Sequence, residues 1–115
     1  MLTFISFALI SATSLATVQD VEPFRLSYSN CLTDFTTLHL DQKTGTRAFK
    51  DAAKSACADE RNAMVSAITK DELEFGSSQS EATTYAEEEA DGVLFSFTDG
   101  YAEYANSNTR PMKAE

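Results

Sequence analysis

The sequence of 115 residues contains few of the residue types that carry recognisable chemistry. It has no Trp, one His, two Cys, four Gly and two Pro, and nine Lys and Arg against 18 Asp and Glu. A formal charge of −9 excludes the Lys/Arg surplus on which sequence-independent nucleic-acid binding and docking on anionic membranes depend. A hydrophobic content of 43% argues against a wholly disordered chain. The length suits one domain and is too short for two.

Catalytic and metal-binding motifs are missing from the sequence. It contains no HExxH, GxSxG or Gly-rich phosphate loop, and His39 is the single histidine. Two cysteines with one distant histidine do not make a zinc site, and the acidic run 87–91 lacks the spacing of an EF-hand loop. The sequence therefore predicts no enzyme, no cofactor and no metal site.

The first 16 residues are typical of an export signal. They hold no charged side chain, and their apolar run ends in Ser14-Leu15-Ala16, a small-x-small pattern of the kind signal peptidase cuts. The usual Lys or Arg of the n-region is missing, so either the α-amino group supplies the positive charge or the true start codon lies upstream. The alternatives to an export signal are a buried helix or an uncleaved anchor, because Leu2–Val18 is just long enough to span a bilayer. We expect cleavage after Ala16 and a periplasmic or secreted protein with no stable membrane insertion thereafter.

Two cysteines, Cys31 and Cys57, are expected to form a disulfide in an oxidising compartment, with a reactive thiol pair as the alternative. Apolar spacing predicts helices over 23–40 and 46–75, joined by a turn in which Gly45 is able to take a positive φ. If these helices run antiparallel, residues whose numbers sum to 88 face each other, which pairs the two cysteines. The apolar stripe of the first helix is Phe24, Tyr28, Cys31, Phe35 and Leu38. The sequence thus predicts a helical hairpin stapled by one disulfide.

A third helix is predicted over 78–105. It opens with Ser78 and Glu81 in a capping-box pattern, and its length favours a kink or break at Gly92. A strand over 93–98 is the alternative, which we set aside because it would have no strand to pair with. The apolar stripe of this helix is Ala90, Leu94, Phe97, Tyr101 and Tyr104. The overall prediction is an all-α small helical bundle over residues 17–105, with a mobile tail over 106–115.

Glu60 interrupts the apolar stripe of the second helix, where the hairpin register sets it opposite Tyr28. A carboxylate in such a place needs a hydrogen-bond donor, or desolvation raises its pKa. We expect either a Tyr28–Glu60 hydrogen bond or an acid side chain reaching solvent at the helix edge. The alternative is an acid whose protonation loosens the core as a pH-responsive switch.

The charges are segregated along the chain. Residues 81–105 carry seven acids and no base, and a helical wheel places Phe95 among acids on the face away from the core stripe. The simplest interpretation is a solvated surface together with charge complementarity between the second and third helices. The functional interpretation is an acidic face that docks a cationic partner or another copy of the protein through an aromatic anchor. The candidate surface is Phe95, Glu88, Asp91 and Asp99.

These observations predict a small exported, acidic, non-catalytic helical protein that acts as an interaction or structural module. Its partner is an unidentified protein or a second copy of the chain. Two alternatives remain open, an acid-stress type of periplasmic holdase and an inhibitor of a secreted enzyme. Small helical bundles host unrelated functions, so the fold class itself does not choose among the three.

Overall fold

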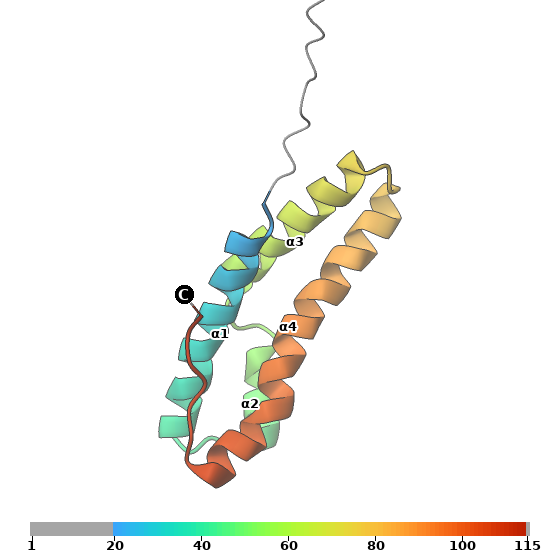
Figure 1. Cartoon of the computed structure of the whole chain (residues 1–115). Helices are drawn as coiled ribbons and strands as arrows, with labels where there is room; N and C mark the ends of the chain where they lie inside the picture. Colours follow the sequence, from blue (N-terminus) through green and yellow to red (C-terminus); the bar gives the residue numbers. More distant parts are fainter. Residues whose placement is uncertain (1–19, 115) are drawn as a thin grey trace, which may run out of the picture.

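The computed structural model describes residues 20–114, and four α-helices account for most of this part of the chain (Figure 1). They are α1 (Glu22–Asp41), α2 (Thr46–Ala53), α3 (Ala58–Glu74) and α4 (Gln79–Ser107). Residues 20–114 contain no strand, so the all-α bundle is confirmed and the strand over 93–98 is excluded. The predicted export signal lies outside the described residues. Within residues 20–114, no helix is both long and apolar enough to cross a membrane.

Three helix ends follow the local sequence signals, and the turn after α1 does not. Pro23 lies in the first turn of α1, Ser78 caps α4 by accepting the N–H of Glu81 at 3.2 Å, and Gly76 ends α3 with a φ of 97°. In the turn after α1, Lys43 takes the positive φ of 55°. Gly45 has a φ of −64° and starts α2 instead, so the expectation for Gly45 was wrong.

The predicted helix over 46–75 is divided into α2 and α3. Residues 54–57 form a turn, and Cys57 has a φ of 56°, a left-handed conformation that a continuing α-helix does not allow. The break redirects the short α2 so that Phe49 becomes fully buried against the C-terminal half of α4. No Gly or Pro marks this turn in the sequence, which is why periodicity alone predicted one helix.

The disulfide between Cys31 and Cys57 is present, with a Cα–Cα distance of 6.0 Å. It joins the middle of α1 to the junction of α2 and α3. Closing a loop between positions 26 residues apart stabilises the fold by about 3–4 kcal/mol in the chain-entropy model. The bond therefore holds the one place where the helical hairpin is interrupted.

The core consists of two clusters of buried side chains, and α4 contributes to both. The first cluster is Tyr28, Leu32, Met64, Ile68, Ala86, Ala90 and Phe97. The second cluster is Leu40, Phe49, Ala53 and Tyr101. The predicted stripe of α4 is confirmed, whereas Leu38 of the α1 stripe is 52% exposed. Leu32 and Leu40 are buried instead. α1 packs against α2, α3 and α4, so its buried face is wider than the face that would contact a single helix.

α4 runs unbroken through Gly92, so the predicted break there is wrong. Apolar residues on both sides of Gly92 belong to the first cluster, which holds the helix together across it. After α4, the described part of the tail follows α1 (Figure 1). Arg110 pairs with Asp41 at 2.9 Å, and Lys113 pairs with Asp34 at 2.8 Å.

Candidate interaction surface

A groove between α2 and the C-terminal half of α4 has a volume of about 490 Å³. Its residues are Thr46, Arg47, Lys50, Asp51 and Lys54 from α2 and the following turn, and Leu94, Phe95, Thr98 and Asp99 from α4. Phe95 is 64% exposed although it is one of the largest apolar side chains of the protein. The volume lies in the range of ligand and peptide sites, and an exposed aromatic in a groove is typical of an interface anchor.

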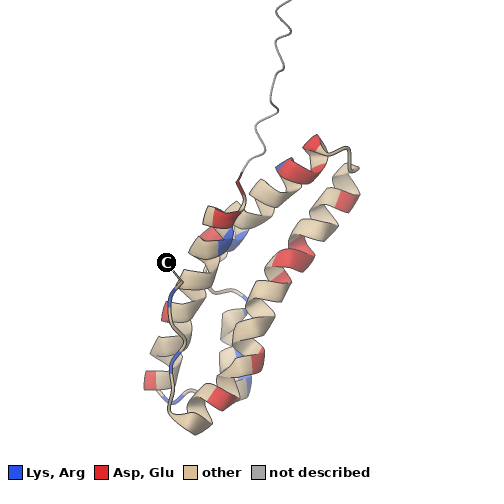
Figure 2. Cartoon of the chain, viewed as in Figure 1, with Lys and Arg blue, Asp and Glu red and all other residues tan. Residues whose placement is uncertain are grey.

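One side of the groove is basic. Arg47, Lys50 and Lys54, called here the cation wall, follow α2 and its end. Lys54 forms an exposed ion pair with Asp51 at 3.8 Å, whereas Arg47 and Lys50 take part in no ion pair within residues 20–114. Figure 2 shows α2, tan with blue at its basic residues, beside the C-terminal half of α4, which is red and tan. An acidic protein thus carries a locally basic surface next to an exposed aromatic side chain.

The other side of Phe95 is acidic. A helix advances about 100° per residue, so Leu94 and Thr98 lie on the α2 side of Phe95, and Glu103 lies on its other side. Asp99 lies between Phe95 and Glu103 and also lines the groove, and Glu88 is nearly in line with Phe95. Glu88, Asp99 and Glu103 are called here the acid ridge. All three side chains are exposed, and none forms an ion pair within the described residues. Phe95 therefore lies between a wall of one charge and a ridge of the other.

Closer to the N-terminus of α4, two arginines from other helices donate hydrogen bonds to its acidic side chains, and we call them the arginine clamps. Arg61 of α3 donates to Asp91 at 2.6 Å and to Glu87 at 3.0 Å. Partial burial acts to lower the pKa of Arg61, but its hydrogen bonds to Tyr28, Asp91 and Glu87 outweigh burial and raise it. The guanidinium therefore stays charged, and the predicted complementarity between the second and third helices is present at this pair of carboxylates.

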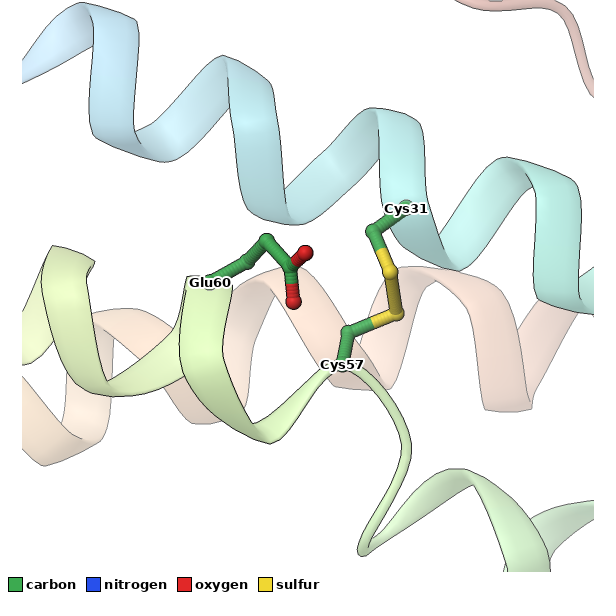
Figure 3. A group of neighbouring side chains, drawn as sticks. All are labelled: Cys31, Cys57 and Glu60. Carbon is green, nitrogen blue, oxygen red and sulfur yellow. A yellow bond between two sulfur atoms is a disulfide. The ribbon is translucent and has the colours of Figure 1, made fainter.

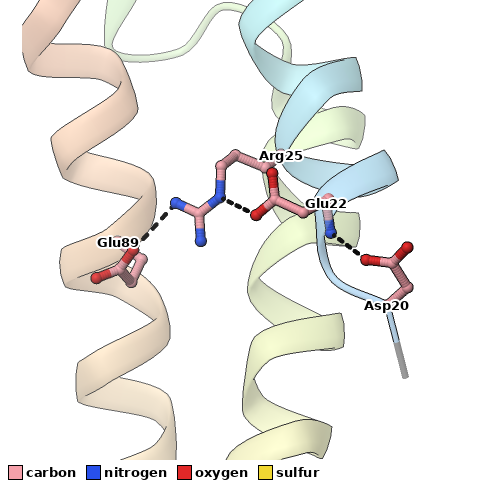
Figure 4. A network of polar contacts seen from close by, with 4 residues as sticks. All are labelled: Asp20, Glu22, Arg25 and Glu89. Carbon is pink, nitrogen blue, oxygen red and sulfur yellow. Dashed lines mark hydrogen bonds and ion pairs between the residues drawn. The ribbon is translucent and has the colours of Figure 1, made fainter. Parts of the chain in front are cut away.

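Arg25 of α1 is the second clamp (Figure 4). It donates to Glu89 of α4 at 3.0 Å and to Glu22 of its own helix at 3.2 Å. Burial again acts to lower the pKa of Arg25, and the hydrogen bond with Glu89, followed by the charge of Glu22, raises it above the ordinary value. Asp20 accepts the backbone N–H of Glu22 at 3.0 Å and so caps the first turn of α1. These bonds neutralise the acids of α4 near α1 and α3 but leave the acid ridge unpaired.

The four residues of the predicted surface are divided by these contacts. Phe95 and Asp99 line the groove, and Glu88 is exposed beside them. Asp91 instead bonds to Arg61, which gives it a structural role. The cation wall was present in the sequence as a basic flank of the second helix, but its position across from Phe95 depends on the break before α3, which the sequence did not reveal.

Tyr28 and Glu60 do not pair with each other. The Tyr28 hydroxyl accepts a long hydrogen bond of 3.4 Å from Arg61, whose guanidinium carbon also lies 6.0 Å from the centre of the Tyr28 ring. Glu60 is half-buried and turns toward the disulfide between α1 and α3 (Figure 3). Its carboxylate and the two disulfide sulfurs lie within 4.8 Å of one another. The structure thus replaces the expected Tyr–Glu pair with a cluster of Glu60, Cys31 and Cys57.

In comparisons with known proteins, no model of a protein family, no curated protein and no solved structure matches the chain. Function must therefore be argued from the surface and the side-chain clusters themselves.

Proposed function

We propose that this chain is a small exported, non-catalytic interaction module, and that its binding surface is the groove around Phe95, occupied by a second copy of the same chain. The observation that carries the proposal is the position of the exposed Phe95 between the cation wall and the acid ridge. Aromatic anchors at the centre of a patch with polar and charged surroundings are the usual organisation of protein interfaces.

The mixed charge of the patch selects the partner. A cationic partner would meet Arg47 and Lys50, and a partner with a uniformly anionic surface would meet Asp99. A surface with both signs on opposite sides of an apolar centre complements itself, which is the requirement for an isologous two-fold interface. If the two-fold axis runs parallel to α4 near Phe95, each cation wall faces the partner's acid ridge. The two Phe95 rings then meet at the centre, and the two α4 helices run parallel.

The oligomeric state tests this proposal. We expect sedimentation equilibrium in about 0.15 M salt, where the screening length is about 8 Å, to show a concentration-dependent dimer. Phe95→Ala is expected to shift the protein to monomer, whereas Phe75→Ala, which removes an equally exposed aromatic far from the groove, leaves the dimer unchanged. A wild-type chain that stays monomeric up to millimolar concentration overturns the proposed partner.

A charge-swap pair tests the geometry more sharply. Arg47→Glu with Lys50→Glu makes wall and ridge both acidic, and Asp99→Lys with Glu103→Lys makes both basic. Each variant alone is expected to be monomeric because wall and ridge then carry like charge. Mixed in equal amounts, the two are expected to form a heterodimer, since each wall now meets a ridge of opposite sign. If the wild-type chain dimerises but the mixture of the two variants does not associate, the two-fold arrangement is overturned.

Export is supported by the uncharged apolar stretch over residues 1–16 and by a disulfide that is compatible with an oxidising compartment. The test is the intact mass of the natively expressed protein from fractionated cells. We expect a chain that begins at Thr17 and gains two hydrogens on reduction. A full-length chain with free thiols in the cytosolic fraction would contradict export.

A further inference from the structure

We propose that Cys31, Cys57 and Glu60 form a binding site for a zinc-like divalent cation when the disulfide is reduced. Cys31 comes from α1, Cys57 from the turn before α3 and Glu60 from α3, and the three side chains meet between α1 and the start of α3 (Figure 3). One ligand atom from each, the two sulfurs and a carboxylate oxygen, lies within 4.8 Å of the other two. The inference is independent of the proposed dimer, because the cluster lies outside the groove.

The carboxylate of Glu60 is available to a ligand. Within residues 20–114 it takes part in no hydrogen bond and no ion pair, although the next residue in the chain is an arginine. Arg61 is unavailable to it because its guanidinium is bonded to Glu87 and Asp91 on α4. Glu60 is half-buried, so the group is partly withdrawn from water yet reachable from solvent. Once the disulfide is reduced, this carboxylate and the two sulfurs form a set of three potential metal ligands.

The geometry requires a small movement. Zinc–sulfur bonds are about 2.3 Å long, and at a tetrahedral ion two thiolates lie about 3.8 Å apart. The Cα atoms of the two cysteines are 6.0 Å apart, so rotation of the side chains opens this space once the sulfurs are no longer bonded. The turn over 54–57 gives additional freedom, because it belongs to neither α2 nor α3. Cys57 also precedes the first turn of α3, where the helix dipole stabilises negative charge.

Conversion of the disulfide to a metal site requires a dithiol reductant as co-reactant, which supplies the electrons and protons. The reductant transfers two electrons and two protons, its two thiols becoming a disulfide while the Cys31–Cys57 bond breaks to give two thiols. Binding of the cation then releases both thiol protons to solvent, and the metal is held by two thiolates, one carboxylate oxygen and a water in the fourth position. Two soft sulfur ligands and one hard oxygen ligand favour zinc over calcium or magnesium, which prefer oxygen alone.

Zinc binding by the reduced protein tests the site. The chain is reduced with a dithiol under anaerobic conditions, the reductant is removed, and Zn²⁺ affinity is measured by competition with a chromogenic chelator. We expect reduced wild type to bind one Zn²⁺ and the oxidised protein to bind none at this site. Glu60→Gln, which keeps the shape of the side chain, is expected to lower the affinity at least tenfold. Asp59→Asn, at the adjacent exposed acid, is the matched control and should leave it unchanged.

Two results would overturn the inference. One is a reduced wild-type chain that does not compete with the chelator. The other is equal affinity of wild type and Glu60→Gln, which would mean that the thiols bind zinc without the folded cluster. The comparison of wild type with Glu60→Gln still decides the question if reduction loosens the bundle. An unfolded chain does not hold Glu60 beside the two sulfurs, so the two proteins would then bind Zn²⁺ with equal affinity. Circular dichroism of both forms, with and without Zn²⁺, identifies that case.

Discussion

The two ends of the bundle are packed by different means. At the first cluster, small residues of α4, Ala86 and Ala90, let α3 and α1 approach closely, and arginines from both helices bond to acids at the edge of the contact. At the second cluster, two aromatic rings carry the packing. Phe49 and Tyr101 stack with centroids 3.9 Å apart and planes 10° from parallel.

This difference shows where the fold depends on single side chains. α1, α3 and α4 are long helices with many shared contacts, so the first cluster distributes its stabilisation over seven residues. α2 has eight residues, too few for a stable isolated helix, and it contributes one large buried side chain. Arg47 and Lys50 of the cation wall lie on this same short helix, so the proposed interface depends on Phe49.

The largest effect is expected from Phe49→Ala. Removing a fully buried Phe costs about 3–5 kcal/mol of unfolding free energy, because burial is lost and a cavity is left. Urea denaturation measures the total loss of unfolding free energy, and amide hydrogen exchange shows which helices lose protection. We expect faster exchange in α2 and the following turn, with α3 and the N-terminal half of α4 still protected. Uniform loss of protection over all four helices would show that the two ends do not differ in this way.

A smaller effect is expected from the arginine clamps at the other end. Arg61→Ala removes hydrogen bonds to two carboxylates from a side chain that is 18% exposed, which should cost about 1–3 kcal/mol. Arg25→Ala removes a comparable pair from a side chain that is 35% exposed, and we expect less than about 1 kcal/mol. Chemical denaturation of both variants at low and high salt makes the comparison. Equal losses for the two would contradict the role assigned to burial.

The smallest effect at neutral pH is expected from Tyr101→Phe, about 1 kcal/mol for the hydrogen bond that the hydroxyl donates to the Thr44 carbonyl, 2.6 Å away. The pH dependence is more informative. Burial raises the pKa of Tyr101 above its ordinary value of 10.0, so the unfolded chain loses this proton first. Its contribution to stability is complete below pH 10 and is lost as pH rises through the folded-state pKa.

Unfolding free energies of wild type and Tyr101→Phe between pH 8 and pH 11 provide the check. The variant should be less sensitive to alkali than wild type, since it lacks the buried phenol. Parallel curves for the two proteins would show that Tyr101 does not contribute to the alkaline loss of stability.

The fold was predictable where local signals and periodicity agree. Pro23, Ser78 and Gly76 mark helix ends that the structure confirms, and the antiparallel register correctly paired Cys31 with Cys57. The break at Cys57 was not predictable, because a left-handed cysteine has no local sequence signal. The positive φ of Lys43 was missed for a similar reason, since glycine two residues later is the more obvious candidate.

The candidate surface was predictable in part. Helical periodicity alone places Phe95 off the core stripe among acids, and Phe95 is exposed. Which acids of α4 are paired depends on how α1 and α3 approach it. The sequence alone therefore could not show that Asp91 bonds to Arg61 while Asp99 lines the groove. The Glu60 cluster was also invisible, because the register indicated Tyr28 and gave no reason to look toward the disulfide.

The participation of α4 in both clusters has a consequence for the order of events during folding. α4 follows α1, α2 and α3 in the chain, and until it is complete neither Tyr28 and Met64 nor Phe49 can be fully covered. The cysteines, by contrast, are both present in the first half of the chain. In an oxidising compartment, the covalent bond is therefore able to form before α4 packs, and α4 then closes both clusters around a hairpin that is already linked.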